Sequence, residues 1–332
     1  MTKKELITQY IEENQLHKEP KRTIARMIVR AFPEVFEQTD KQINSVRRQV
    51  TSILPCKKIT KENRKRVERG IEALIPRALK KGSKTFNLPQ GTWIILNDIH
   101  FPYHDEKALK TALMYAKERD VDGILLNGDL CDFYSISSHA KKWDGVDLVG
   151  EIEIAQEFFS GLVEEFPKAK IIWKLGNHEN RLFRDLNKNA PYIAGLLSMN
   201  FGMNMGIEQF FRTKEFGIEV LHDQTIIDAN GLLVLHGHEY GIGGVNPSRK
   251  MAQELKTSAI QGHLHRSESY NIKNGLGQDI MCATMGCLCN LNADYYGKAK
   301  LVWVHGFGML DVTEEGWAFE NKIIIKGNIY GN

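Results

Sequence analysis

The sequence predicts an α/β protein in which two packed sheets are flanked by helices, preceded by a small all-helical segment. Between residues 93 and 200, apolar strand-like runs alternate with amphipathic helical stretches, the order expected of a parallel sheet with covering helices. The stretch 218–326 consists mostly of strand-like runs joined by short turns, which indicates a second, mixed sheet. Helical periodicity and an excess of basic residues mark the first 84 positions.

The composition is that of an ordinary globular protein. The chain has 332 residues, of which 42% are hydrophobic and 26% charged, enough for one large domain and an accessory one. No apolar run approaches the roughly 18 residues of a membrane span, and the first residues lack a signal-peptide core. We therefore expect a cytoplasmic protein without a membrane partner.

The five cysteines show no paired framework and no zinc-finger spacing. We interpret them as reduced thiols that serve mainly in packing. Cys287 and Cys289, separated by one residue, are an alternative soft-metal pair.

The basic N-terminal part is expected to form three short helices, over residues 3–16, 21–32 and 41–53, with a cap at Thr39-Asp40 before the third. Residues 1–84 carry 21 lysines and arginines against 10 acidic residues. The three helices resemble a small helix-turn-helix module, whose third helix would present Arg47 and Arg48 to nucleic acid. The alternative is a helical cap or an arm for homo-oligomerisation. The predicted division is a module at 1–55, a basic linker at 56–90 and a catalytic domain at 91–332.

The first sheet is expected to begin with a strand at 93–98, which delivers Asp98 and His100 to its C-terminal end. Alternate residues of a strand point to the same face, so this carboxylate and imidazole can reach one ion together. A structural, hydrogen-bonded histidine is the alternative. Helices and strands are then expected to alternate at 105–119, 123–127, 148–166, 169–175 and 179–200, and the second sheet to use 218–238, 258–263, 267–283 and 299–326.

Four more polar clusters follow apolar runs, at turns where strands would end. They are Gly128-Asp129-Leu130-Cys131-Asp132, Gly176-Asn177-His178-Glu179, His236-Gly237-His238 and Gly262-His263-Leu264-His265. Glycine permits a tight turn in each cluster. Five such clusters at five strand ends indicate one shared site rather than separate buried polar groups.

These five ordered clusters resemble the motifs of the calcineurin-like metallophosphoesterase superfamily, over residues 93 to about 320. The resemblance implies a four-layer αββα sandwich in which two divalent ions activate a water that hydrolyses a phosphate ester. The layout is also similar to that of phage-encoded metallophosphoesterases with a short helical N-terminal segment. A phage origin would make the location the host-cell cytoplasm.

The same resemblance assigns the ligands. It implies that Asp98, His100 and His265 hold one ion, that Asn177, His236 and His263 hold the other, and that Asp129 bridges both. His238 remains an alternative to His236, because both flank the same glycine. Many of these donors are imidazoles, which favours Mn²⁺, with Fe, Zn and Ni as alternatives.

Beside the ligands, the resemblance implies that His178 is catalytic and protonates the leaving oxygen. Asp132 would orient His178 and hold it protonated, or alternatively act as a turn cap. Arg181 completes a pattern of the related phosphoprotein phosphatases and could bind a phosphate oxygen. The sequence after Asp132 lacks the Arg-Gly of those phosphatases, which argues against a protein phosphatase.

The resulting expectation is a metal-dependent phosphoesterase, most simply a phosphodiesterase or nuclease acting on DNA, because a basic module would concentrate a polyanionic substrate. One alternative is a phosphatase for small nucleotides or proteins. Another is a DNA-binding regulator with an inert phosphoesterase domain, against which the complete ligand set argues.

Overall fold

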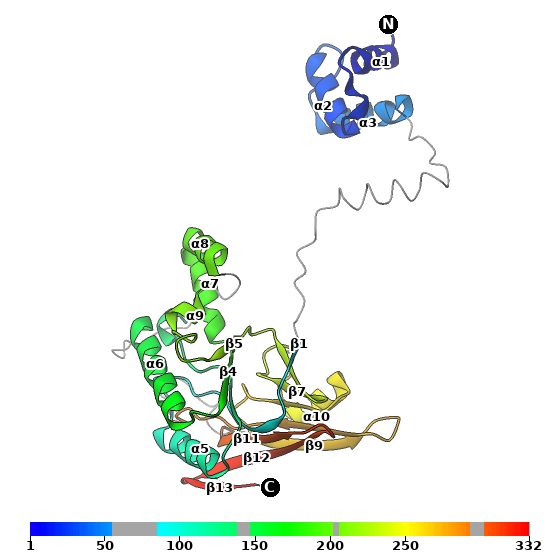
Figure 1. Cartoon of the computed structure of the whole chain (residues 1–332). Helices are drawn as coiled ribbons and strands as arrows, with labels where there is room; N and C mark the ends of the chain where they lie inside the picture. Colours follow the sequence, from blue (N-terminus) through cyan, green and yellow to red (C-terminus); the bar gives the residue numbers. More distant parts are fainter. Residues whose placement is uncertain (55–84, 138–146, 202–205, 293–301, 332) are drawn as a thin grey trace. The chain divides into compact units, whose positions relative to one another are not determined.

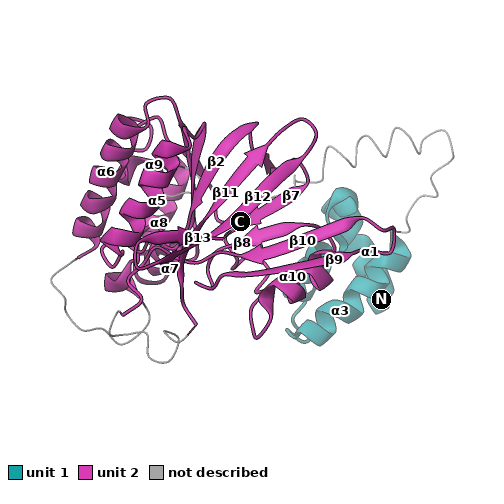
Figure 2. Cartoon of the chain, turned by 90° about the horizontal axis from the view of Figure 1, so that it is seen from below, with its two compact units in different colours: residues 1–80 teal, residues 81–332 magenta. Residues whose placement is uncertain are grey.

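The computed structural model describes residues 1–54, 85–137, 147–201, 206–292 and 302–331. The chain divides into two compact units, residues 1–80 and 81–332 (Figures 1 and 2). The basic segment predicted at 57–84 lies outside the described residues.

The first unit contains three α-helices and one short 3₁₀ helix among its described residues: α1 (Lys3–Glu13), η1 (Leu16–Lys18), α2 (Lys21–Ala31) and α3 (Asp40–Ile53). Thr2 and Glu5 form a capping box at α1, and Thr39 caps α3. The apolar faces meet in a small core that includes Ile24, Ile28, Val46 and Val50. The three helices predicted from periodicity are therefore present, with ends within three residues of those expected.

The second unit contains a seven-stranded sheet in the order β13-β12-β11-β2-β3-β4-β5. Its strands β2 to β5 are parallel, and β11 to β13 extend it in antiparallel fashion. The bounds are β2 (Gly91–Leu96), β3 (Gly123–Asn127), β4 (Lys170–Lys174), β5 (Glu219–Leu221), β11 (His305–Val312), β12 (Trp317–Ile325) and β13 (Asn328–Tyr330).

A six-stranded mixed sheet in the order β1-β6-β7-β8-β10-β9 packs against it. Its bounds are β1 (Thr85–Asn87), β6 (Ile226–Ala229), β7 (Leu232–Leu235), β8 (Ala259–Gln261), β9 (Glu268–Lys273) and β10 (Asp279–Thr284). In this sheet β7, β8 and β10 are parallel, while β6 pairs antiparallel with β7 and β9 pairs antiparallel with β10. Like the seven-stranded sheet, it is therefore mixed.

Side chains of β2 show how the layers are stacked. Trp93 and Ile95 point into the core between the two sheets, and Ile94 and Leu96 point into the core under the helices α5 (Glu106–Glu118) and α6 (Leu148–Glu165). Helix α10 (Pro247–Leu255) covers the other sheet. Figures 1 and 2 show α5 and α6 on one side of the two sheets and α10 on the other. The four-layer αββα sandwich expected from the sequence is confirmed.

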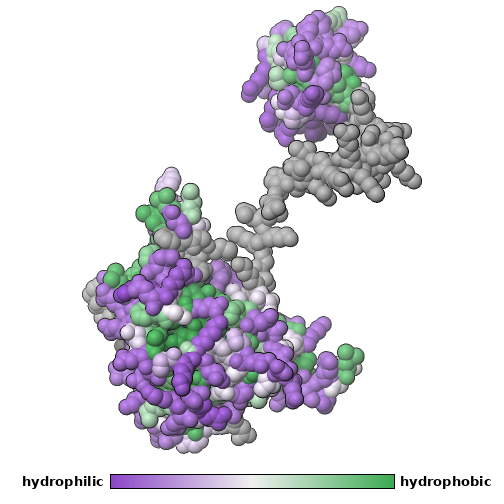
Figure 3. All heavy atoms as spheres, in the orientation of Figure 1, coloured by the Kyte–Doolittle hydropathy of each residue, from purple (hydrophilic) through white to green (hydrophobic). Residues whose placement is uncertain are grey.

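Three helices follow β4, namely α7 (Glu179–Asn189), α8 (Pro191–Phe201) and the short α9 (Ile207–Phe210). The single helix expected at 179–200 is broken at Ala190, because the residue before a proline disfavours helical geometry. Helix α8 exposes four large side chains, those of Tyr192, Ile193, Leu196 and Met199. Figure 3 shows hydrophobic residues on the surface at the place of α8.

Two details differ from the sequence-based expectation. Residues 85–90 were assigned to the linker, but β1 already pairs with β6 and Leu88 is buried in the core between the sheets. The strands after residue 218 were assigned to the second sheet, but β5 and β11 to β13 join the first. Among the described residues, no helix is long and apolar enough to cross a membrane.

Candidate metal centre

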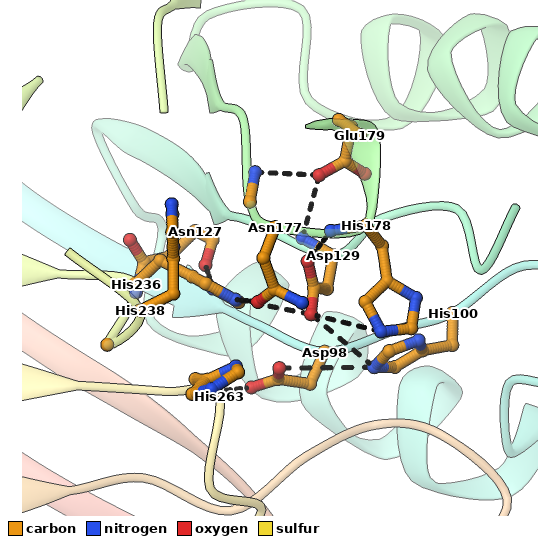
Figure 4. Close-up of polar contacts among 12 residues, drawn as sticks. Asp98, His100, Asn127, Asp129, Asn177, His178, Glu179, His236, His238 and His263 are labelled. Carbon is orange, nitrogen blue, oxygen red and sulfur yellow. Dashed lines mark hydrogen bonds and ion pairs between the residues drawn. The ribbon is translucent and has the colours of Figure 1, made fainter. Parts of the chain in front are cut away.

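The predicted polar clusters all lie at the C-terminal ends of strands, where the two sheets meet. Asp98 and His100 follow β2, Asp129 follows β3, and Asn177 follows β4. Histidines from the other sheet, His236 after β7 and His263 and His265 after β8, complete the set. Figure 4 labels all of these residues except His265 and shows their side chains gathered from both sheets. Parallel strands of both sheets therefore bring together residues that are far apart in the sequence.

Asp98, His100 and His265 form one compact group of potential donors. His265 Nε2 lies 3.2 Å from Asp98 Oδ1 and 3.3 Å from His100 Nε2. All three residues are buried, the most accessible at 4% of its surface. Two imidazole nitrogens and a carboxylate oxygen therefore converge on one point.

Asp129, His236 and His263 form a second group. His236 Nε2 lies 3.2 Å from Asp129 Oδ2 and 3.0 Å from Asn177 Oδ1. The main-chain N–H of His263 donates to Asp98 Oδ2, so the two groups are joined by a hydrogen bond. Asp129 Oδ2 is also 4.0 Å from His100 Nε2 in the first group. The Asp129 carboxylate therefore lies between the two groups.

The donor atoms fit divalent cations. Asp98 Oδ1 is fully buried and accepts no hydrogen bond of acceptable geometry, although a histidine nitrogen lies close to it. A buried carboxylate oxygen without a hydrogen bond is costly unless a cation balances it. Carboxylates, an amide and imidazoles are the ligands that Mn, Fe, Zn and Ni accept in proteins.

The close approach of carboxylates and imidazoles shifts the pKa values of Asp129 and His236. Burial opposes ionisation of Asp129, but its electrostatic interactions with the neighbouring His178 and His236 rings, and a hydrogen bond from His236, hold its pKa well below the usual range. Burial likewise disfavours a charged His236, but the neighbouring Asp129 raises the pKa of His236 to about 9. The carboxylates thus attract positive charge strongly, whether it comes from protons or from metal ions.

The structure distinguishes the two histidines that flank Gly237. His236 directs Nε2 toward Asp129 and Asn177, while its Nδ1 donates to the main-chain oxygen of Asn127 at 2.8 Å. His238 points elsewhere, with Nε2 3.4 Å from Asp223 Oδ2. His236 is therefore the residue in position to serve as a ligand, and its other ring nitrogen is held as ligand histidines require.

The backbone is unusual at the candidate ligands. Five of these residues have left-handed φ values between 51° and 62°: Asp98, His100, Asp129, His263 and His265. For residues other than glycine, such a conformation costs on the order of 1–3 kcal/mol each and persists only where the surroundings enforce it. Strain of this kind clusters at functional sites, and five of the twelve non-glycine residues with positive φ among the described residues are candidate ligands.

Close approach explains two of the motif glycines. A Cβ on Gly128 would lie 2.3 Å from His236 Nδ1, and one on Gly176 would lie 2.3 Å from Asp129 Oδ1. Neither position has room for a side chain. The turns after β3 and β4 can therefore pack directly against two candidate ligands only because glycine occupies them.

Glu179 has a positioning role that sequence reasoning did not assign. Its buried carboxylate accepts main-chain N–H groups from four residues of two turns: Asp129, Leu130, Cys131 and Gly176. Burial raises the pKa of Glu179 to about 7, while these donors favour the charged form. Glu179 thereby ties the turn after β3 to the turn after β4 (Figure 4). Its place directly after Gly176-Asn177-His178 was the available signal.

Asp132 lies close to two histidines and to Arg181. Its carboxylate lies 3.1 Å from His100 Nδ1 and 3.2 Å from Arg181 Nη1, whereas His178 Nδ1 is 3.7 Å away. His178 Nδ1 instead donates to the main-chain oxygen of Asp132 at 2.8 Å. The carboxylate therefore orients His100 rather than His178, and a main-chain carbonyl holds the His178 ring.

His178 is neutral in this arrangement, contrary to the expectation that it is held protonated. Burial lowers the pKa of His178 to about 3, even though Asp129 and Asp132 favour the charged form. Its Nε2 lies 2.8 Å from Arg181 Nη2. Because a guanidinium can only donate, Nε2 must be the acceptor and Nδ1 must carry the proton. Arg181 thus contacts both His178 and Asp132, and its side chain is 16% exposed.

A buried ion pair supports the turn that carries His236. Glu239 pairs with Lys174 of β4, and the Glu239 carboxylate accepts the main-chain N–H groups of His236 and Gly237. Both charged side chains are at most 3% exposed. Burial opposes ionisation, but the Lys174 charge lowers the pKa of Glu239 to about 2.

This pair predicts an acid-sensitive contribution to stability. Because the folded-state pKa of Glu239 lies below its ordinary value of 4.5, the ionised carboxylate stabilises the fold above that pH, and this is lost as the pH falls toward 2. The loss is about 3 kcal/mol. Denaturant unfolding at several pH values should show that Glu239→Gln flattens this dependence and lowers stability near neutrality. Glu254→Gln, at a surface glutamate that is 48% exposed, is the control; equal pH slopes in both variants would contradict the assignment.

Arg47 and Arg48 lie in the other unit, exposed on α3. They line a surface hollow together with residues of α2 and the end of α3: Lys21, Arg22 and Thr51. Four cationic side chains from two helices therefore gather on one face of the helical unit. This is a surface suited to phosphate groups.

Comparison with known proteins agrees with the architecture of the second unit. The calcineurin-like phosphoesterase family matches residues 92–283, more than half of the chain. The Gene 54 protein of Mycobacterium phage D29 is 28% identical over 233 residues, which cover 66% of this chain and 88% of the phage protein. The Gene 54 protein of Mycobacterium phage L5 is 26% identical with the same coverage.

Two solved structures are similar at low identity. Vacuolar protein sorting 29 from Cryptosporidium parvum aligns with a TM-score of 0.39 and 12% identity, over 74% of this chain and 97% of the other. YfcE, a phosphoesterase from E. coli, aligns with a TM-score of 0.31 and 13% identity, over 66% and 88%.

Proposed function

Because the chain belongs to the calcineurin-like phosphoesterase family, we propose that it is a dinuclear metal-dependent phosphodiesterase that cleaves nucleic acid. The observation that carries the dinuclear part is the Asp129 carboxylate, which lies between two groups of buried donors. Asp98, His100 and His265 would hold one ion, and Asn177, His236 and His263 the other. Manganese is the proposed metal because the donor set mixes imidazoles with oxygen ligands.

Two divalent ions bound there would polarise the phosphoryl group and lower the pKa of an attacking water. The chain itself supplies orientation. Asp132 fixes the His100 ring, Asn127 fixes the His236 ring, and Glu179 holds the two turns at their distance. The substrate phosphate therefore meets a preorganised set of donors.

His178 and Arg181 act on the phosphate and the leaving group. Since His178 Nδ1–H is held by a carbonyl, a proton that the ring takes up from solvent is carried at Nε2, from which it can pass to the leaving oxygen. A protonated Nε2 can no longer accept from Arg181 Nη2. Protonation of His178 thus frees one guanidinium N–H for a phosphate oxygen.

Nucleic acid is the proposed substrate because the helical unit carries a basic face. Lys21, Arg22, Arg47 and Arg48 line one hollow, and residues 1–84 have 11 more basic than acidic residues. Neutralising phosphates with such side chains gives strong, sequence-independent, salt-sensitive binding. A tethered basic unit would raise the local concentration of a polyanion at the catalytic domain.

Removing this basic face should weaken DNA cleavage selectively. We expect the double variant Arg47→Ala/Arg48→Ala to bind DNA less tightly at all sequences, and to lower the slope of log affinity against log salt by about two. Hydrolysis of a small aryl phosphodiester should be unchanged. Lys4→Ala/Lys18→Ala, at exposed lysines outside the hollow, is the control for lost charge. Equal losses on DNA and on the small diester, or none on either, would refute the tethering role.

The class of ester is tested with generic substrates. An aryl phosphodiester, an aryl phosphomonoester and labelled single- and double-stranded DNA should be incubated with Mn²⁺ and, separately, after chelation. Metal-dependent cleavage of the diester and of DNA is the expected result. Cleavage of the monoester alone would identify a phosphatase instead, and would leave the basic unit to another role.

A further inference from the structure

Three buried soft or borderline donors lie next to the proposed dinuclear centre, and one of them is the second ring nitrogen of the candidate ligand His265. Cys287 and Cys289 follow β10 and are at most 1% exposed, and His265 is 4% exposed. Cys289 Sγ lies 3.4 Å from Cys287 Sγ and 3.7 Å from His265 Nδ1. One donor atom from each of the three residues lies within 4.8 Å of the other two.

We propose that His265 Nδ1 and the sulfurs of Cys287 and Cys289 form a binding site for one thiophilic divalent metal ion, of the zinc class. The site is distinct from the phosphoesterase centre and shares only the His265 ring with it. Nε2 of that ring faces Asp98 and His100, whereas Nδ1 faces the sulfurs.

The spacing of the donors fits a single ion. With metal–sulfur bonds near 2.3 Å and metal–nitrogen bonds near 2.0–2.1 Å, the donors of a tetrahedral or trigonal site are roughly 3.5–4.0 Å apart. The observed separations of 3.4 and 3.7 Å are within a few tenths of an ångström of that range. Only small shifts would seat an ion between them.

His265 differs from the other candidate ligand histidines in the partner of the ring nitrogen that faces away from the dinuclear centre. The rear nitrogen of His100 faces the Asp132 carboxylate, and that of His236 faces the Asn127 carbonyl. These are the usual partners of ligand histidines. The rear nitrogen of His265 faces sulfur instead, and a thiol is a weak hydrogen-bond partner. Sulfur is, however, a strong ligand for soft metals.

The surrounding backbone holds the two cysteines in place. The Cys287 N–H donates to the main-chain oxygen of Val304, and the Gly306 N–H donates to the main-chain oxygen of Cys287. The main-chain oxygen of Cys289 lies 2.9 Å from His305 Nε2. The main chain that carries both cysteines is therefore ordered before any ion arrives, which reduces the entropy lost on binding.

Charge balance selects a divalent ion. Binding would release the protons of both thiols to solvent, and two thiolates neutralise an ion of charge +2. With a neutral imidazole as the third donor, which keeps its proton on Nε2 and so binds no second ion there, the buried assembly carries no net charge. A neutral complex is the form that such a water-poor position tolerates best.

Cadmium is the probe for this site, because cadmium–thiolate coordination gives a sulfur-to-metal absorption band that oxygen and nitrogen ligands do not give. The reduced, metal-stripped full-length protein should develop this band and saturate it at one thiolate-bound ion per chain. Cys287→Ser and Cys289→Ser should each weaken Cd²⁺ binding by about 100-fold or more, since loss of a ligand costs at least as much as loss of its outer support. Cys282→Ser, at a buried cysteine whose sulfur faces the Thr257 carbonyl, should retain the band.

Two further measurements keep the test independent of catalysis and of folding defects. Asp129→Ala, which should disable the phosphoesterase centre, should retain the thiolate band. In the wild-type chain, Cd²⁺ should slow alkylation of Cys287 and Cys289, mapped by mass spectrometry, but not that of Cys282. Absence of the band in the wild type, its persistence in the Cys287→Ser/Cys289→Ser double variant, or equal alkylation with and without Cd²⁺ would overturn the proposal.

Discussion

Asp129→Ala is expected to lose bound metal and, with it, essentially all hydrolysis. The wild-type carboxylate lies 3.2 Å from His236 Nε2 and 4.0 Å from His100 Nε2, so it is the group that both sets of donors share. Its removal would deprive both proposed ions of a ligand and would leave neighbouring imidazoles without their counter-charge. Loss of an outer-shell partner alone typically costs 10–100-fold in metal affinity, and we expect the loss of this shared ligand to exceed that range.

The measurement is metal content after equilibration with Mn²⁺ and gel filtration, together with turnover of an aryl phosphodiester. Asp228→Ala is a matched control. The Asp228 carboxylate accepts a main-chain N–H from Gly231, as the Asp129 carboxylate does from His178, but Asp228 lies on β6, outside the candidate ligands. Full metal occupancy in Asp129→Ala would refute the bridging position. Metal loss in both variants would indicate a general defect of folding instead.

His178→Ala is expected to retain metal and to lower turnover by about 10²–10⁴-fold. The ring is held by the Asp132 carbonyl and Arg181, and although it lies close to His100, it is not among the proposed ligands. Its deletion should therefore remove proton transfer to the leaving oxygen without emptying the centre.

Leaving-group dependence separates this role from a structural one. A nitrophenyl diester, whose leaving group needs little protonation, should be hydrolysed by His178→Ala with a small deficit. A nucleotide or alkyl leaving group should show the full deficit. A metal-free variant, or the same deficit on both substrates, would contradict the assignment.

The candidate centre could be predicted from the sequence because its information is local. Each cluster directly follows an apolar strand, as Asp98 follows β2 and Asp129 follows β3. The C-terminal ends of parallel strands in one sheet lie side by side, so position along the strand already indicates proximity. The starts of the helices could also be predicted, because an N-cap depends on the type of a single residue, such as Thr39 or Asp105.

What could not be predicted depends on pairing and on side-chain choice. β11 joins the first sheet because its residues pair with those of β2, more than 200 positions away. Hydrophobic periodicity predicts that a segment is a strand but not which strand it pairs with. Asp132 had two histidines within reach, and only the fold shows that its carboxylate lies nearer to His100. Glu179 acquired its role because main-chain N–H groups of two separate turns converge on it.

The assembly of the centre from both sheets has a consequence for synthesis of the chain. The first candidate ligand is residue 98 and the last is residue 265, while β11, which flanks β2, ends only at residue 312. A ribosome therefore releases the basic helical unit before the emerging polypeptide can complete the candidate centre. Until β8 and β11 have also left the exit tunnel, the nascent protein carries its cationic face without the complete set of candidate ligands.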